Sequence, residues 1–278
     1  MQKGFRRNLI IFTDLDGTLL DSAYSFRKAL PALKLIKEKN IPLILCSSKT
    51  MAEIEYCRKK LKNEHPFISE NGGGIFIPKK YLKFRMQYPG LKIEEGENYL
   101  IIKPGAAYAD LREAIEGLRS EGFDIRGFGD MTVREVAGLT GLKISDAERA
   151  KQRDFDEPFV FSGKESSLKR LKQRIRSKGY NYTQGEFFHI TGDTDKGRAV
   201  EILKKLYSEQ YGKITTVALG DSPNDIEMLR KVDYPVIIRK HDGSFDRRIR
   251  IKNAVKADGA GPEGWNRAVL ELLETLFV

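Results

Sequence analysis

Two acidic loops in this sequence each follow a short apolar run. Asp14 and Asp16 come directly after the apolar run at 9–12, and Asp221 follows a second such run at 214–219. Carboxylates this close together repel each other unless a cation or a proton lies between them. Ligands of an open parallel sheet bind beyond the carboxyl ends of its strands, so we expect the two loops to meet there. Such an oxygen-rich site suits Mg²⁺.

The second loop also contains Asn224 and Asp225, so that four acidic groups would converge on one point. The alternative is that each Asp-Gly pair forms a turn and each aspartate caps a helix. Taken alone, either loop fits that alternative about as well as it fits a metal site. Two such loops, both ending apolar strands, favour the metal site.

Two further features predict a phosphate site. Ser47 follows the apolar strand predicted at 41–46 and precedes a helix N-terminus, where free N–H groups bind anions. Ser48 or Thr50 could instead cap that helix, and the two interpretations are compatible. Lys196 begins a predicted helix, where a cation opposes the helix dipole at a cost of about a few tenths of a kcal/mol. Breaking a local rule in this way favours a functional role, although an ordinary surface lysine also fits.

Strands and helices alternate at both ends of the chain. A strand at 9–12, a helix at about 25–39, a strand at 41–46 and a helix at 51–61 follow one another, and the same style resumes from about residue 195. This alternation predicts a parallel sheet with crossover helices, and hence the α/β class.

The pattern changes in the middle of the chain. Residues 83–187 mix short strands and helices without long buried runs, which predicts a separate α+β unit. The expected organisation is therefore a catalytic core domain from residues 1–82 and 188–278, with a second, substrate-recognition domain inserted at 83–187.

Composition limits the partners and the compartment. The 278 residues are 40% hydrophobic and 32% charged, and no apolar run approaches the ~20 residues of a membrane-spanning helix. The N-terminus has no signal-peptide core, and Cys46 and Cys57 lack metal-ligand spacing, so we expect a cytoplasmic protein without a membrane partner. The net charge of +10 would suit nucleic acid, an anionic membrane or an acidic small substrate. Because carboxylates repel nucleic acid, a non-enzymatic nucleic-acid-binding protein is the less favoured alternative, and no nucleic-acid partner is expected.

The order of these motifs resembles the haloacid dehalogenase superfamily. DLDGT at 14–18, a serine after the second strand, a lysine before a helix and GDxxND at 220–225 occur in that order. An insertion after the glycines at 72–74 and the following strand is similar to the larger α/β cap of the type IIB members. The resemblance implies a Rossmann-like parallel-sheet core of the haloacid dehalogenase type with an inserted α+β cap domain.

The same resemblance implies the mechanism of a phosphoric monoester hydrolase. Asp14 would attack phosphorus and form an aspartyl-phosphate, while Asp16 would protonate the leaving oxygen and then activate water. Ser47 and Lys196 would bind the remaining phosphoryl oxygens. Mg²⁺ would be held by the Asp14 carboxylate, the Asp16 backbone carbonyl and the Asp221 carboxylate, with Asn224 and Asp225 in support.

A closer resemblance lies in three segments: SSKT at 47–50, GFGDMTVREVAGLTGL at 127–142 and AKQRDFDEPF at 150–159. They look like the mannosyl-3-phosphoglycerate phosphatase family, which implies an anionic, phosphorylated sugar-glycerate as substrate and a role in mannosylglycerate biosynthesis. Basic and amide groups would read the substrate's carboxylate. The candidates are Lys49, Gln152 and Arg153, with Lys151 and His189 behind them.

Three other activities stay open on these motifs. A glucosyl-3-phosphoglycerate phosphatase shares them. A phosphatase for another sugar phosphate is close to the favoured interpretation. A phosphomannomutase shares the aspartate pair and a similar cap, but it needs a second phosphate pocket, which no sequence feature here identifies.

Overall fold

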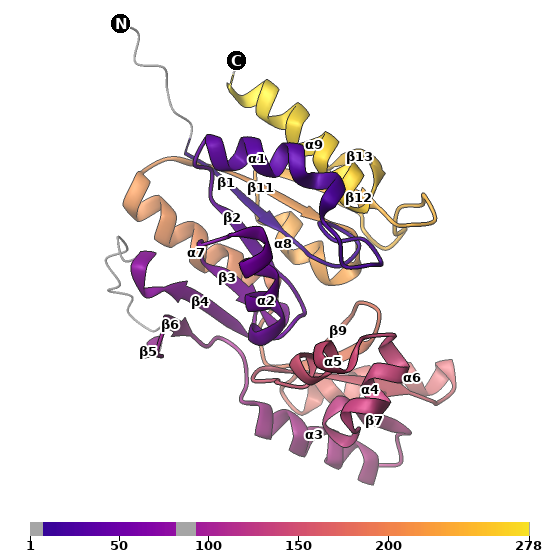
Figure 1. Cartoon of the computed structure of the whole chain (residues 1–278). Coiled ribbons are helices and arrows are strands. Elements are labelled where there is room, and N and C mark those ends of the chain that lie inside the picture. Colours follow the sequence, from indigo (N-terminus) through magenta and orange to yellow (C-terminus); the bar gives the residue numbers. More distant parts are fainter. Residues whose placement is uncertain (1–7, 82–92, 278) are drawn as a thin grey trace, which may run out of the picture. The chain divides into compact units, whose positions relative to one another are not determined.

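The computed structural model describes residues 8–81 and 93–277, and the chain divides into two compact units (Figure 1). The first unit comprises Met1–Ser47, Pro78–Tyr88 and Lys196–Val278, and the second comprises Ser48–Ile77 and Pro89–Asp195. Residues 48–77 thus group with the second unit by their contacts, whereas the sequence pattern assigned them to the core. The core and cap boundaries of 1–82, 83–187 and 188–278 stay a prediction.

The first unit contains five neighbouring strands in the order β13-β12-β11-β1-β2, and every adjacent pair is parallel. The last five residues of β1 are all buried, which fits a parallel strand covered on both faces. The α/β fold with a parallel-sheet core is therefore confirmed. The strands are β1 (Asn8–Thr13), β2 (Leu43–Cys46), β11 (Ile214–Gly220), β12 (Tyr234–Arg239) and β13 (Val255–Ala260).

Four helices accompany this sheet: α1 (Leu30–Glu38), α7 (Lys196–Tyr211), α8 (Ile226–Arg230) and α9 (Gly261–Phe277). Helix α9 packs on β12, β13 and α1, whereas α7 packs on α8 and β11. Trp265 of α9 is fully buried and donates its indole N–H to the Thr13 hydroxyl at 2.9 Å. That bond ties α9 to the last residue of β1. Short 3₁₀ turns lie at Arg27–Ala29, Lys79–Tyr81 and Pro223–Asp225.

Two details differ from the sequence expectation in this unit. The helix expected at about 25–39 begins with the 3₁₀ turn, and α1 starts only at Leu30, with a proline in its first turn. Strand β13 was not predicted. Only Ala257 of its six residues is buried, so it lacks the apolar alternation by which a strand is recognised.

The second unit begins with α2 (Met51–Leu61), whose predicted capping box is present: Thr50 accepts from the Glu53 N–H, and Glu53 accepts from the Thr50 N–H. Two antiparallel strand pairs follow. They are β3 (Phe67–Ser69) with β4 (Gly74–Pro78), separated by a 3₁₀ turn at Glu70–Gly72, and β5 (Ile93–Glu95) with β6 (Tyr99–Ile102).

A four-stranded antiparallel sheet in the order β7-β8-β10-β9 forms the rest of the second unit. The helices of this unit contribute to two separate apolar cores. Helices α3 and α6 pack in one core, and α4 and α5 pack in the other. Helix α5 ends at Ala150, so Gln152 and Arg153 lie in the connection between α5 and β8. The strands are β7 (Ile125–Gly127), β8 (Asp156–Phe161), β9 (Asn181–Gln184) and β10 (Phe188–Thr191); the helices are α3 (Tyr108–Ser120), α4 (Val133–Thr140), α5 (Ile144–Ala150) and α6 (Glu165–Ser177), with a 3₁₀ turn at Phe128–Asp130.

Within the described residues, every helix is too short or too polar to cross a lipid bilayer.

Candidate active site

The register of β1 and β11 places the two acidic loops side by side. Thr13 lies beside Leu219, and the backbone N–H of Asp14 donates to the Leu219 carbonyl at 3.0 Å. Asp14 and Asp221, which follow the two strands, therefore leave the sheet at the same edge. This is the carboxyl edge, where the sequence predicted a ligand site.

Lys196 lies between two of the carboxylates. Its Nζ is 2.6 Å from Asp14 Oδ1 and 2.7 Å from Asp225 Oδ1, and its side chain has no exposed surface. Burial alone would lower the pKa of Lys196, but the charges of Asp14 and Asp225 outweigh burial and raise that pKa above its ordinary value. Lys196 is therefore a buried, charged lysine. The surface interpretation of Lys196 is wrong.

Asp225 organises the second loop. Its Oδ2 accepts hydrogen bonds from the backbone N–H groups of Asp221 at 3.0 Å and Ser222 at 3.1 Å. A Cβ on Gly220 would lie 2.6 Å from the Asp225 Cβ, so only glycine leaves room for this side chain. Both oxygens of Asp225 are thus engaged, one with Lys196 and one with the loop backbone.

The first loop contacts the second through Gly17 and Thr18. Thr18 donates its hydroxyl to Asp221 Oδ1 at 3.2 Å. Gly17 has a φ of 73°, and a Cβ there would lie 2.7 Å from Asp221 Oδ2. Glycine is required at this position both for the left-handed backbone and for the close approach of Asp221.

Three buried carboxylates form a possible cation site. Asp14, Asp221 and Asp225 each offer an oxygen, and these oxygens lie within 4.8 Å of one another. Burial raises the pKa of Asp14 well above its usual value despite the nearby Lys196. Burial, with the Asp225 charge, raises the pKa of Asp221 to about 7. A hard divalent cation would relieve this repulsion, and the all-oxygen donor set fits Mg²⁺.

The other predicted residues of the first unit lie in the same loops. Asp16 is half-buried, and its charge contributes to the raised pKa of Asp14. Ser47 is buried and directly follows β2. Because β2 pairs in parallel with β1, Ser47 leaves the sheet at the same edge as Asp14. Asn224 accepts a hydrogen bond from the Ser222 hydroxyl at 2.6 Å.

The predicted substrate residues belong to the second unit. Lys49 Nζ lies 3.5 Å from Glu53 Oε1, and Arg153 Nη2 lies 4.0 Å from Glu53 Oε2, so Glu53 brings the two cations together. Arg153 also donates from Nε to the Ala150 carbonyl and from Nη1 to the Ser48 carbonyl, both at 2.8 Å. Gln152 is exposed beside them.

Sequence reasoning missed a buried polar cluster in the second unit. Glu70 has no exposed surface and accepts hydrogen bonds from the backbone N–H groups of Asp154 and Phe155. Asp156 and Glu157 at the start of β8 are equally buried. The sequence did carry one signal, an acidic pair directly before the apolar Pro158-Phe159. Acidic residues are almost never fully buried without partners, so acidic residues at the start of a buried strand indicate buried polar partners.

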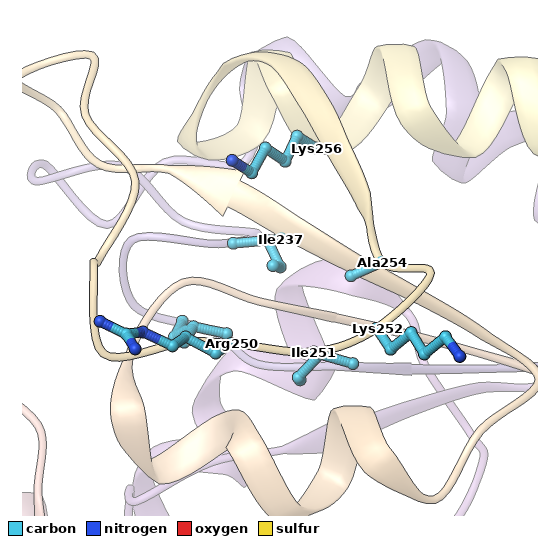
Figure 2. A pocket seen from close by; sticks show the side chains of 7 residues that line it. Ile237, Arg250, Ile251, Lys252, Ala254 and Lys256 are labelled. Atoms are coloured by element: carbon cyan, nitrogen blue, oxygen red, sulfur yellow. The ribbon is translucent and has the colours of Figure 1, made fainter.

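A hollow of about 440 Å³ lies elsewhere on the first unit, beside β12 and β13 (Figure 2). Apolar and cationic side chains line it, and none of its described lining residues is a carboxylate, so it does not suit a metal. Ile237, Ile251 and Ala254 are among its apolar lining residues, and the cations Arg250, Lys252 and Lys256 also line it.

Known proteins with related sequences match this chain along most of its length. The chain is 45% identical over 267 residues to a Methanococcoides burtonii protein named glucosyl-3-phosphoglycerate/mannosyl-3-phosphoglycerate phosphatase, covering 95% of this chain and 97% of that protein. It is 36% identical to the mannosyl-3-phosphoglycerate phosphatase of Pyrococcus furiosus over 82% of this chain and 90% of that one.

Solved structures match the fold over nearly the whole chain. A Bacteroides thetaiotaomicron protein described among phosphatases of the haloalkanoate (HAD) enzyme superfamily matches with a TM-score of 0.66 at 16% identity, covering 100% of this chain and 98% of that one. A subclass IIB sugar phosphatase matches with a TM-score of 0.64 at 14% identity, covering 97% and 99%. A family model described as haloacid dehalogenase-like hydrolase matches residues 11–100 and 134–242. Because that match spans more than half of the chain and the relatives span most of it, the protein belongs to the haloacid dehalogenase-like hydrolase family.

Proposed function

We propose that this protein is a Mg²⁺-dependent phosphatase that hydrolyses a glycosyl-3-phosphoglycerate, with mannosyl-3-phosphoglycerate favoured, to the glycosylglycerate and phosphate. The observation that carries the proposal is the buried cluster of Asp14, Lys196, Asp221 and Asp225 at the carboxyl edge of the sheet. The substrate class is supported by the names of the relatives, and we propose the cytoplasm as the compartment.

In this mechanism Asp14 is the nucleophile. One of its carboxylate oxygens forms a bond to phosphorus while the bond between phosphorus and the glycerate oxygen breaks. Asp16 gives its proton to the departing oxygen and then takes a proton from the water that hydrolyses the aspartyl-phosphate. Lys196 holds Asp14 in place and, with Ser47, binds phosphoryl oxygens.

The metal ligands in this proposal are the Asp14 carboxylate, the Asp16 backbone carbonyl and the Asp221 carboxylate. Asn224 and Asp225 support them. The supporting role of Asp225 follows from its hydrogen bonds, because Lys196 and the backbone of Asp221 already occupy its two oxygens. When bound, Mg²⁺ neutralises charge between the nucleophile and the phosphate.

We further propose that Lys49, Gln152 and Arg153 bind the carboxylate of the substrate. Gln152 is exposed, and Arg153 donates from Nε and Nη1 to backbone carbonyls, while its Nη2 has only the 4.0 Å ion pair with Glu53. A guanidinium also matches a carboxylate better than an ammonium does.

The test is phosphate release with Mg²⁺ and with excess EDTA. The substrates are mannosyl- and glucosyl-3-phosphoglycerate, 3-phosphoglycerate and hexose 1- and 6-phosphates, with Asp14→Asn protein alongside. We expect metal-dependent release from the glycosyl-phosphoglycerates that Asp14→Asn abolishes. Release from hexose phosphates alone would refute the substrate assignment. Turnover that requires added hexose bisphosphate would show a mutase.

A further inference from the structure

The four-stranded sheet of the second unit has two unlike faces. On one face Phe159, Ile190 and their neighbours pack into the apolar core with α3 and α6. On the other, Val160 and Phe187 contact the small core of α4 and α5. This second face also carries polar side chains. Asp156 and Thr191 pair across the strands, and His189 pairs in the next row with Pro158 on one side and Thr183 on the other.

His189 is held in this polar half-face by a chain of hydrogen bonds. Its Nδ1 lies 2.7 Å from Asp156 Oδ1, and Asn71 donates from Nδ2 to Asp156 Oδ2 at 2.6 Å. All three side chains are buried, with Asp156 fully so and His189 6% exposed. The histidine ring therefore has one orientation, set by Asp156, whose own orientation is set by Asn71.

This arrangement decides what the other ring nitrogen can do. A carboxylate only accepts hydrogen bonds, so the ring proton of a neutral His189 is at Nδ1, and Nε2 carries a lone pair. Nε2 has no hydrogen bond with any described residue, and the hydroxyl of Thr183, the cross-strand neighbour of His189, has none either. The lone pair of Nε2 can therefore accept a hydrogen bond from a ligand that carries a donor.

We infer that His189 binds the substrate's sugar, with Nε2 accepting a hydrogen bond from a sugar hydroxyl. This inference rests on the proposed function. In a glycosyl-3-phosphoglycerate, the phosphate and the sugar occupy the two hydroxyl oxygens of glycerate, and the phosphate and carboxylate ionise. The hydroxyl donors of the substrate therefore belong to the sugar. Asp156 and Asn71 are positioning residues for the ring.

Two substitutions of His189 distinguish sugar binding from a structural role. The amide of Asn overlays Nδ1 of His and keeps a donor for Asp156, whereas the amide of Gln reaches the place of Nε2 and keeps an acceptor for the sugar. We expect His189→Asn to raise KM for the glycosyl-3-phosphoglycerate about three- to tenfold, the range for one lost hydrogen bond. We expect His189→Gln to raise it less, and kcat to stay within about twofold in both variants.

The controls use a smaller ligand and a second histidine. The inhibition constant of 3-phosphoglycerate, which has no sugar, measured against the glycosyl substrate should be the same in wild type and both His189 variants. His65→Asn, also in the second unit, should leave KM for the glycosyl substrate unchanged. The inference is overturned if Gln raises KM more than Asn, or if 3-phosphoglycerate is affected as strongly as the glycosyl substrate.

A measurement on the unaltered protein decides the question should the variants not fold. The chain has three histidines, so the imidazole ¹⁵N signals can be resolved and assigned. Mannosylglycerate or glucosylglycerate should shift the Nε2 signal of His189, and glycerate should not. If the wild type hydrolyses glycosyl-3-phosphoglycerates while His189 gives no response, the inference fails and the proposed function stands. If it does not hydrolyse them, the proposed function fails. If, in addition, the ¹⁵N signal does not respond to the glycosylglycerates, the inference fails as well.

Discussion

The ammonium of Lys196 lies 2.6 Å from a carboxylate oxygen of Asp14, although 182 residues separate them in the chain. The same ammonium lies 2.7 Å from Asp225, so a single buried cation is shared by the predicted nucleophile and by the residue that organises the second loop. The electrostatic balance of the site therefore depends on Lys196.

Replacing Lys196 by Met should remove activity and also weaken the fold. Two buried carboxylates would lose their cation, and breaking a buried ion pair from one side costs about 3–5 kcal/mol. We expect kcat to fall at least about a hundredfold, given the loss of a charge aimed at the phosphoryl group. Steady-state kinetics and urea unfolding measure the two effects. Lys205→Met, an exposed lysine on the same helix, should change neither, and a Lys196→Met protein of normal stability would argue against the buried pair.

Asp221→Asn should raise the Mg²⁺ concentration needed for half-maximal activity, because a neutral amide replaces a charged ligand. Asp14→Asn should leave no activity at any metal concentration, since the amide is not a nucleophile. Titrating Mg²⁺ into the EDTA-treated proteins distinguishes the two. Full activity of Asp221→Asn at wild-type Mg²⁺ levels would rule out Asp221 as a ligand.

Stability should depend on pH through Glu70. Burial raises the pKa of Glu70 from 4.5 to about 8, against the opposing charge of Arg153. Between these values the folded state binds the proton more tightly than the unfolded state, so the free energy of unfolding falls as pH rises. Glu70→Gln removes this titration and keeps an acceptor for the backbone N–H groups. From pH 5 to pH 8 the wild type should lose more stability than Glu70→Gln by at least about 1.4 kcal/mol, the equivalent of one pKa unit.

The control for this experiment is Glu121→Gln. Ion pairs with Arg174 and Lys178 lower the pKa of Glu121 to about 2, so its titration lies below this pH range. Urea unfolding at several pH values provides the measurement. Parallel pH profiles for wild type and Glu70→Gln would show that Glu70 is ionised throughout.

Gly127→Ala should destabilise the second unit. A Cβ at residue 127 would lie 2.0 Å from Glu157 Oε1, and Glu157 is held by Tyr108, Arg112 and the Gly129 N–H. Overpacking of this kind costs about 1–3 kcal/mol. Gly138 in α4 offers the matched control, because a Cβ there meets nothing within 4 Å. Gly138→Ala should be neutral or stabilising by up to about 1 kcal/mol, and equal effects of the two changes in urea unfolding would refute the packing argument.

Much of the fold could be predicted because its signals are local. The apolar run of β1 and the capping box of Thr50 and Glu53 depend on residues a few positions apart, and both are present as expected. Strand β13 escaped prediction for the same reason: five of its six residues are not buried, so no local pattern marks it.

The residues with candidate roles were also visible in the sequence, because two aspartate loops after apolar strands are a chemical pattern in themselves. The side chains with which these residues pair were not visible in the sequence. That Lys196 meets Asp14, that Glu70 holds the backbone at Asp154 and Phe155, and that Asp156 fixes the ring of His189 follow from packing between distant segments. Propensity and periodicity act over a few residues, whereas the partner of a buried charge is chosen by whichever distant group the sheet register and helix packing bring within about 3 Å. The sequence by itself therefore determined which residues are chemically capable, and the tertiary structure alone decided how they pair.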